Sequence, residues 1–414
     1  MRIQKCKGTR DLPPEEMRRF RQIEGVFRNT CLKWGYQEIR TPTIEYLHLF
    51  TSTGTLTPGT LSKVYSFLDW DGWSGERVVL RPDGTIPVAR LYIDSATKEM
   101  LARLFYVTNI FIFEETGKET REKWQCGAEL IGANSISADV ELITIALETL
   151  KNTGLKNIEL KLSHAGIIRA LLTGFGLSPE EQGKVFDQIL DGNVAVLSRL
   201  KGQTPELARL LTPLLDLKGE SSGFLKNLKA VFNHNLPEFT PALDNFITIT
   251  DLLTAMGQKY EIDIASGRGF EYYTGLIFQL FAGELKVGGG GRYNALIPLM
   301  GGGNIPASGF ALYLDPLIGL IEPPRATAER ILITVQDEQP GLMKSAFQAM
   351  KQLHEAGFVA SLNLNAKTKE TYKWRLEVRR KAPRFILSGK SGKRQQEVAT
   401  IDDVLKLLGG QRAR

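Results

Sequence analysis

Apolar residues recur along the chain with two different periods, which separate predicted helices from predicted strands. The first period is helical and covers residues 13–34, where we predict an amphipathic helix. The segments "KVYSFLD", "RVVLRPD", "LFYVTNIFIFEE" and "KWQCGAELIG" then alternate between apolar and polar positions, and this predicts an antiparallel sheet. The apolar positions of the first helix are Met17, Phe20, Ile23, Phe27 and Cys31.

A long helical stretch interrupts the strand pattern. The segment "ADVELITIALETLKNTG" predicts a helix, and "NIELKLS" returns as a strand. Residues from about 166 to 258 are mostly helical in pattern and rich in leucine, and strand patterns resume at "YEIDIASGRGFEYYTGLIFQLF". We therefore predict a helical insertion within one sheet-containing domain.

The C-terminal part shows a different order of elements. The segment 322–330, "EPPRATAER", breaks both periods and predicts a linker. Beyond it, strands such as "RILITV", "FVASLNL" and "RFILS" alternate with helical patterns, one of them near 369–380, and predict a small βαβα domain with a mainly parallel sheet. The expectation is an α+β chain of two domains, residues 1–325 and 326–414.

Composition narrows the class of protein. With 414 residues, 43% hydrophobic and 24% charged, the chain resembles a globular protein of two or three domains. Its cysteines and histidines are scattered, so we expect no zinc site, disulfide framework, metal centre or cofactor. These residues are Cys6, Cys31, Cys126, His48, His164, His234 and His354.

The charge and hydropathy of the chain predict where the protein is located and which partners it binds. The N-terminus lacks the apolar core of a signal peptide, and no apolar run has membrane-spanning length, so a cytoplasmic protein without membrane contact is expected. The net charge of +6 is small for this length. A basic run between Lys367 and Arg394 leaves two alternatives, RNA contact or a solvated helix face. We do not expect nucleic acid to be a main partner.

The glycine-rich segment "VGGGGRYN" (287–294) invites comparison with nucleotide-binding loops. It lacks the GK[ST] ending of a P-loop and the glycine spacing of a dinucleotide-binding fingerprint. We interpret it as a place where backbone approaches backbone or a ligand closely.

The segment "RPDGTIPVAR" (81–90) places Asp83 and Thr85 two residues apart, on one side if the chain is extended. A carboxylate beside a hydroxyl suits an ammonium group. The alternative for this segment is a simple Asp-Gly turn.

The segment "KWQCGAELIG" (123–132) places Gln125 and Glu129 on one strand face, because their separation is even. A glutamate on the inner face of a sheet needs a partner, since an unpaired buried charge is unfavourable. We predict that the partner of Glu129 is either Arg268 or a bound cationic ligand.

The segment "SGRGFEYYTG" (266–275) adds a rigid cationic fork at Arg268. On a strand, Tyr272 and Tyr273 would point to opposite faces, one lining a pocket and the other packing in the core. Together the three segments supply acids, a hydroxyl, an amide, an arginine and a phenol, which suits the binding of one amino acid.

Several segments in order resemble the class II histidyl-tRNA synthetase family. They are "GTRDLPP", "RPDGT", "QCGAELIG", "RGFEYYTG" and "GGGRYNAL". The resemblance covers essentially the whole chain. It implies an antiparallel sheet of six or seven strands that carries a histidine pocket, and a C-terminal domain similar to the family's anticodon-binding domain.

Residue by residue, the resemblance implies roles in histidine binding. Asp83, Thr85 and Gln125 would hold the amino end of the ligand. Glu129 with Tyr272 or Tyr273 would bind its imidazole ring, and Arg268 would lie at its carboxylate. In the enzymes of the family, the arginine that corresponds to Arg268 assists adenylate formation.

Two departures from the family pattern bear on activity. Ile112 in "NIFIFEE" and Pro316 in "YLDPL" stand where the family has arginines that bind the phosphates and adenine of ATP. Neither side chain offers a charged fork. The chain therefore resembles a non-catalytic branch, the regulatory subunits of ATP phosphoribosyltransferase.

That branch implies partners. Its members assemble as a homodimer within a hetero-oligomer that contains a short catalytic subunit, and histidine is the feedback effector. The alternative, based on the complete set of domains, is a divergent active histidyl-tRNA synthetase.

Overall fold

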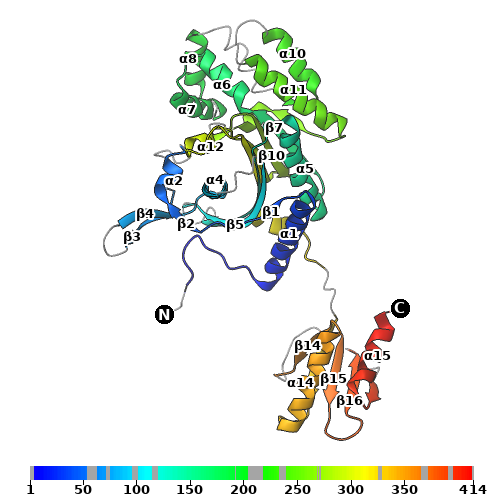
Figure 1. The fold of residues 1–414 in the computed structure, drawn as a ribbon. Helices are drawn as coiled ribbons and strands as arrows, with labels where there is room; N and C mark the ends of the chain where they lie inside the picture. The colour runs from blue at the N-terminus through cyan, green and yellow to red at the C-terminus, as the bar shows by residue number, and fades with distance from the viewer. Residues whose placement is uncertain are drawn as a thin grey trace. The chain divides into compact units, whose positions relative to one another are not determined.

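The structure is a computed structural model in which the chain forms two compact units, Met1–Pro323 and Pro324–Arg414 (Figure 1). The division lies within the predicted linker at 322–330. The residues described are 4–53, 63–70, 75–95, 101–113, 120–191, 193–203, 218–232, 239–267, 269, 272–324, 329–364, 372–389 and 395–412.

The first unit contains a nine-stranded sheet within the described residues, with strand order β1-β5-β6-β12-β11-β10-β7-β9-β8. The pairs from β5 to β7 are antiparallel, and only the flanking pairs β1–β5 and β7–β9 are parallel. The predicted α+β architecture is confirmed, and short flanking strands raise the number above the six or seven implied by the resemblance. The strands are β1 Gln37–Glu38, β5 Ala102–Phe111, β6 Glu122–Ile131, β7 Ile158–His164, β8 Lys218–Gly219, β9 Glu261–Asp263, β10 Leu276–Ala282, β11 Leu285–Arg292 and β12 Ala307–Tyr313.

Helices cover this sheet. The predicted first helix is confirmed as α1, Pro14–Lys33, which begins with prolines and glutamates in its first turn and buries Phe20, Ile23 and Phe27. Its neighbours are α5, Ile136–Asn152, and α13, Leu314–Leu320. On the inner side of the curved sheet, α4 lies enclosed in Figure 1. The elements of that side are α2 Leu47–Thr51, α4 Thr85–Asp94, the 3-10 helix η1 Ile264–Gly267, α12 Leu296–Leu299 and a small sheet of β2 Ile44–Tyr46, β4 Gly75–Leu80 and β3 Ser66–Trp70.

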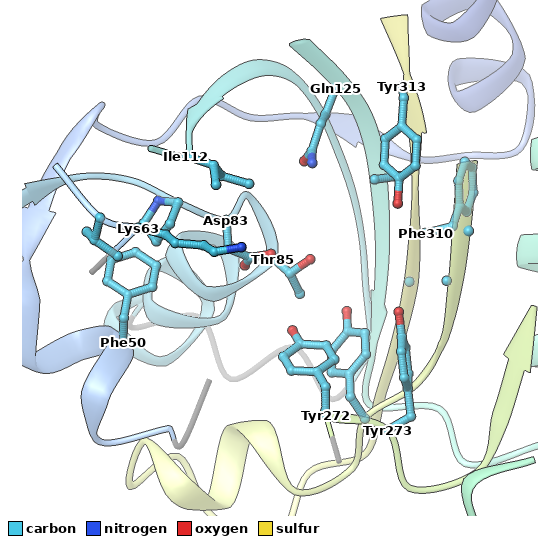
Figure 2. A pocket seen from close by; sticks show the side chains of 17 residues that line it. Phe50, Lys63, Asp83, Thr85, Ile112, Gln125, Tyr272, Tyr273, Phe310 and Tyr313 are labelled. Carbon is cyan, nitrogen blue, oxygen red and sulfur yellow. The ribbon is translucent and has the colours of Figure 1, made fainter. Parts of the chain in front are cut away.

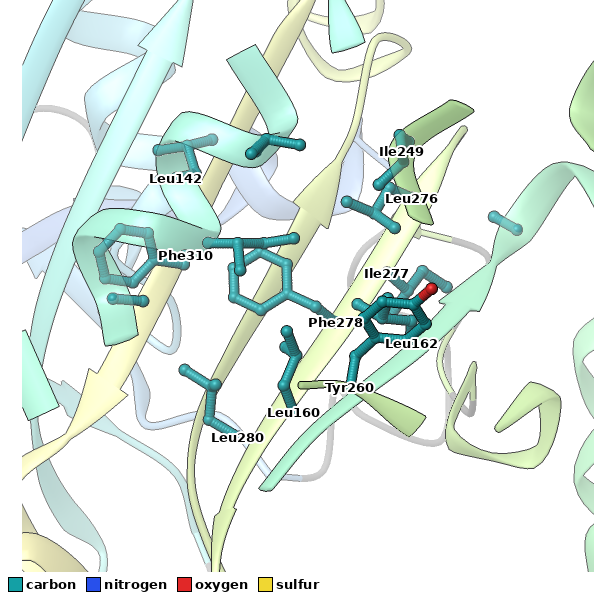
Figure 3. Packing of buried hydrophobic residues seen from close by; sticks show 14 of the residues in the cluster. Leu142, Leu160, Leu162, Ile249, Tyr260, Leu276, Ile277, Phe278, Leu280 and Phe310 are labelled. Atoms are coloured by element: carbon teal, nitrogen blue, oxygen red, sulfur yellow. The ribbon is translucent and has the colours of Figure 1, made fainter. Parts of the chain in front are cut away.

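The core lies between the sheet and its covering helices. Side chains from β7, β10 and β12 meet those of α5 there, as Figure 3 shows for Leu142, Leu160, Phe278 and Phe310. Each is at most 3% exposed. Full burial of one such side chain contributes about 1.5–3 kcal/mol, so this layer fixes the strands on which the site is built.

The predicted insertion is helical, as expected. A two-residue strand, β8, lies within it and pairs with β9. Its helices are α6 Ala165–Gly174, α7 Pro179–Leu190, α8 Val194–Gln203, α10 Ser222–Phe232 and α11 Phe239–Ala255.

The second unit has a five-stranded sheet in its described part, with order β14-β13-β15-β16-β17. Strand β13 is parallel to both neighbours, but β15–β16 and β16–β17 are antiparallel, so the prediction of a mainly parallel sheet was wrong. Its elements are β13 Arg330–Val335, α14 Pro340–Glu355, β14 Val359–Leu362, β15 Trp374–Val378, β16 Phe385–Gly389, β17 Gln395–Val398 and α15 Ile401–Arg412.

The helix predicted near 369–380 was also wrong in its described part, which contains β15. Trp374, Leu376 and Val378 are buried, and they alternate with the exposed Arg375 and the half-buried Glu377. Clustered charges on the solvent face hid this period of two in the sequence. Residues 369–371 lie outside the described part.

Three basic residues in the described portion of the basic run, Lys373, Arg379 and Arg380, form ion pairs with acids of their own unit. Lys373 Nζ lies 2.5 Å from Glu329 Oε1, and Arg380 Nη2 lies 2.9 Å from Asp337 Oδ2. These pairs favour the solvated-surface alternative over RNA contact.

Candidate functional site

The turn after β4 brings the first two predicted site residues together. Asp83 Oδ1 accepts a hydrogen bond of 2.8 Å from the backbone N of Ile86, and Thr85 begins α4. The predicted extended chain was therefore wrong, and the Asp-Gly turn was correct. Its physical reason is local: Asp83 supplies an acceptor to free amides at a helix start, where Pro87 also fits. Both Asp83 and Thr85 line the same pocket (Figure 2).

Strand β6 places Gln125 and Glu129 on one face, as predicted. Gln125 lines the pocket, whereas Glu129 is 1% exposed and lies directly behind the lining residues Thr85 and Tyr293. Its Oε1 accepts from Thr85 Oγ1 at 2.8 Å and from Tyr106 Oη at 3.2 Å, and its Oε2 accepts from Tyr293 Oη. We call Thr85, Tyr106, Glu129 and Tyr293 the floor.

Arg268 was one of the two predicted partners of Glu129, and it lies outside the described residues. The partners that the structure describes are the three hydroxyl groups of the floor. Burial, with a smaller contribution from the charge of Asp83, raises the pKa of Glu129 to about 8, although the hydroxyl donors oppose the shift. Burial therefore favours the protonated, neutral form of this acid.

Tyr272 and Tyr273 both line the pocket, so the predicted opposite orientation was wrong. They precede β10, which begins at Leu276, and the alternation of a strand does not apply to them. Tyr272 packs against Tyr273 and Tyr293, with ring centroids 5.3 and 5.5 Å apart. Its buried Oη has no hydrogen-bond partner among the described residues. A ligand donor or acceptor would supply the missing partner.

Glycines make room for these groups. A Cβ at Gly309 would collide with the carboxylate of Glu129, and one at Gly290 would collide with the backbone oxygen of Gly309. The interpretation of "VGGGGRYN" as a close backbone approach is thereby confirmed. A side chain at Gly309 would fill the space above the floor, whereas one at Gly290 would point toward the core residue Phe310.

The resulting pocket has a volume of about 500 Å³, which is within the usual range for small-molecule sites. Sequence reasoning missed several of its residues. One signal was present, because Tyr293 directly follows β11 in the quoted "GGGRYN" segment. The missed lining residues include Phe50, Lys63, Val64, Tyr293, Phe310 and Tyr313.

Apolar side chains and one lysine line another part of the pocket. We call Phe50, Lys63, Val64 and Ile112 the outer wall. Figure 2 shows Phe50, Lys63 and Ile112 on one side of the pocket. Ile112, at the position where the resemblance implies an arginine, therefore lines the pocket.

Pro316, the second departure, lies within α13. The acid before it, Asp315, is committed to structure, because it accepts from Arg10 Nη2 at 2.6 Å and from the backbone N of Trp124 at 2.9 Å. No arginine lines the pocket in the described part of the chain. The described residues also contain no cluster of acidic, histidine or cysteine side chains suited to a metal ion. Among the described helices, none is long and apolar enough to cross a membrane.

The chain is similar to known proteins over most of its length. The histidyl-tRNA synthetase family profile matches residues 8–317. The chain is 52% identical over 380 residues to an "ATP phosphoribosyltransferase regulatory subunit" of Dehalococcoides mccartyi, covering 91% of this chain and 92% of that protein. It is 33% identical over 438 residues to a "Histidine--tRNA ligase" of Methanosarcina acetivorans, covering 99% of this chain and 100% of that protein.

A solved structure shows the same fold. A protein from Bacillus halodurans, described as an ATP phosphoribosyltransferase regulatory subunit/histidyl-tRNA synthetase, superimposes with a TM-score of 0.77 over 90% of this chain and 95% of that chain, at 23% identity. The chain therefore belongs to the histidyl-tRNA synthetase family, on the branch of the ATP phosphoribosyltransferase regulatory subunits.

Proposed function

We propose that this protein is a histidine-binding regulatory subunit of ATP phosphoribosyltransferase and performs no chemistry itself. It acts in the cytoplasm, as a homodimer within a hetero-oligomer that contains the short catalytic subunit. The catalytic subunit requires it for activity, and histidine bound in its pocket inhibits the complex. The observation that carries this proposal is a pocket whose floor is a buried, hydrogen-bonded glutamate and whose outer wall has Ile112 where the resemblance implies a phosphate-binding arginine.

The floor supports recognition of an imidazole. Glu129 is buried with a raised pKa, which favours its neutral form, and Tyr272 Oη has no hydrogen-bond partner among the described residues. A carboxylic acid and a neutral imidazole can share one proton, which places either a neutral or an ionic pair in the pocket without changing its net charge. Glu129 and Tyr272 therefore suit an imidazole ring, which can donate one hydrogen bond and accept another.

The turn before α4 supports recognition of the amino end. Burial raises the pKa of Asp83, and backbone amides at the helix start offset only part of that effect. A ligand ammonium at this place would favour the charged carboxylate. Thr85 and Gln125 would complete the amino-end contacts, and Arg268 and Tyr273 would contact the carboxylate and the ring.

The outer wall supports the absence of ATP chemistry. Each lost charge contact in a phosphoryl-transfer site costs roughly 3 kcal/mol or more of transition-state stabilisation. Ile112 and Pro316 remove two such contacts, and the binding of histidine requires neither. Feedback then needs only that histidine binds one state of the complex more tightly, with a coupling of about 1–3 kcal/mol.

The test is reconstitution with the organism's short catalytic subunit, followed by sizing and an ATP phosphoribosyltransferase assay with and without histidine. We expect a complex that is active and inhibited by histidine. Glu129→Ala should reduce inhibition and leave assembly intact, whereas Lys151→Met, a change of an exposed lysine on α5, should alter neither.

A second assay separates this function from the alternative of an active synthetase. Histidine-dependent ATP–pyrophosphate exchange should be absent from the purified protein. Robust exchange would overturn the proposal.

A further inference from the structure

Lys63 is a pocket residue to which the family resemblance assigns no role. Its backbone is fixed beside the altered arginine position, since Lys63 O accepts a hydrogen bond of 2.7 Å from the backbone N of Phe113, the residue after Ile112. Its side chain extends along the outer wall toward Asp83 and Thr85 in Figure 2. Lys63 thus brings an ammonium group into the pocket that Ile112 also lines.

This ammonium is available to a ligand. Of the described residues that line the pocket, Lys63 alone carries a positive charge. The ion pairs of the described residues do not include it, and the residue is exposed. A cation that lines a pocket and has no acidic partner favours an anionic group on whatever binds there.

Asp83 identifies the kind of anion. An amino acid carries its ammonium and its carboxylate on one carbon atom, so a site for it needs an acid and a base at the same end. Asp83 and Lys63 both line the pocket, and the side chain of Lys63 extends toward Asp83 in Figure 2. A phosphate dianion would be repelled by the charged form of Asp83, and the neighbouring Phe50 and Ile112 offer it no donors.

We propose that Lys63 binds the carboxylate of the amino acid held in this pocket and so distinguishes amino acids from their amines and alcohols. The inference rests on the proposed histidine site and adds a carboxylate-binding residue to it. The resemblance assigns the same carboxylate to Arg268, a residue that lies outside the described part of the chain. Because Lys63 is exposed, water screens the pair, and its contribution to affinity is about five-fold.

The experiment compares two ligands by calorimetry. L-histidine carries the carboxylate, and L-histidinol replaces it with an alcohol while keeping the ammonium and the ring. Lys63→Met should weaken histidine binding about five-fold and leave histidinol binding unchanged, so that the preference for histidine falls by the same factor. Lys63→Arg should retain the preference, and Lys151→Met is the matched control for loss of an exposed lysine.

The outcomes separate this inference from the function on which it rests. If the wild-type protein binds histidine and Lys63→Met leaves the histidine-to-histidinol ratio unchanged, the carboxylate role is overturned and the histidine site stands. If Lys63→Met only removes competition by inorganic phosphate, Lys63 serves a phosphate and the inference is also wrong. If the wild-type protein binds neither ligand, the histidine site itself fails, and the role of Lys63 fails with it.

Discussion

The floor and the outer wall of the pocket are built on different principles. The floor is a buried acid whose oxygens meet three hydroxyl groups, and each of its polar atoms depends on the others. The outer wall is mostly apolar, and its one charge is an exposed lysine. The contrast teaches that, under the proposed assignment, the binding of a small amino acid needs the polar floor and one lysine of the outer wall, and needs no arginine at Ile112.

The largest expected effect comes from closing the space above the floor. Gly309→Ala places a methyl group against the Glu129 carboxylate, so the floor must move or the strands must separate. We expect histidine binding to fall by more than about 100-fold, together with a loss of stability of about 1–3 kcal/mol, as is typical of overpacking. Calorimetry and urea unfolding measure the two effects.

The matched control for this substitution is Gly319→Ala in α13, where a Cβ meets no atom within 4 Å. A helical Gly→Ala change of this kind should be stabilising by about 0.5–1 kcal/mol. Equal histidine affinity in both variants would contradict the role given to the space at Gly309.

The next effect concerns the proton on Glu129. The folded protein holds the pKa of this acid at about 8, above its ordinary value of 4.5. The contribution of protonated Glu129 to the free energy of unfolding is therefore fully present below pH 4.5, and it is lost as the pH rises through 8. In Glu129→Gln, which cannot ionise, this loss should be absent.

The measurement is the free energy of unfolding of both proteins between pH 5 and pH 8.5. The difference between wild type and Glu129→Gln should grow in favour of the variant as pH rises, by an amount of the order of a few kcal/mol. A difference that does not depend on pH would show that Glu129 is ionised throughout.

A smaller effect tests the unpaired phenol. Tyr272→Phe removes an oxygen that has no protein partner in the described structure, so the variant should be at least as stable as wild type. Histidine binding should weaken by up to about ten-fold if the ligand supplies that partner. Tyr46→Phe, at an exposed tyrosine of β2, is the control. Unchanged affinity in Tyr272→Phe would place the ring of the ligand elsewhere.

The smallest expected effect lies in the support of the tyrosine loop. Arg169 on α6 donates from Nη2 to the backbone oxygen of Tyr273 at 3.0 Å, so the helical insertion holds the loop that lines the pocket. Arg169→Met should weaken histidine binding about three-fold, in keeping with one hydrogen bond, whereas Arg169→Lys should lose less. Equal losses in both variants would point to packing rather than to this bond.

Periodicity alone located much of the framework. The spacing in α1 and the even separation of Gln125 and Glu129 in β6 depend only on helix and strand geometry, which are local properties. Local patterns failed where two signals overlapped. Turn and helix-start chemistry dominated at Asp83, and surface charge hid the period of two in β15.

The sequence by itself determined the fold class, the helical insertion, the acid and amide of β6, and the two positions where arginines are absent. The tertiary structure decided which groups surround Glu129, since its partners Thr85 and Tyr293 lie 44 and 164 residues away in the chain. It also turned both tyrosines inward and brought Lys63 beside Ile112. Such contacts arise when distant strands and turns pack together, and no local period encodes them.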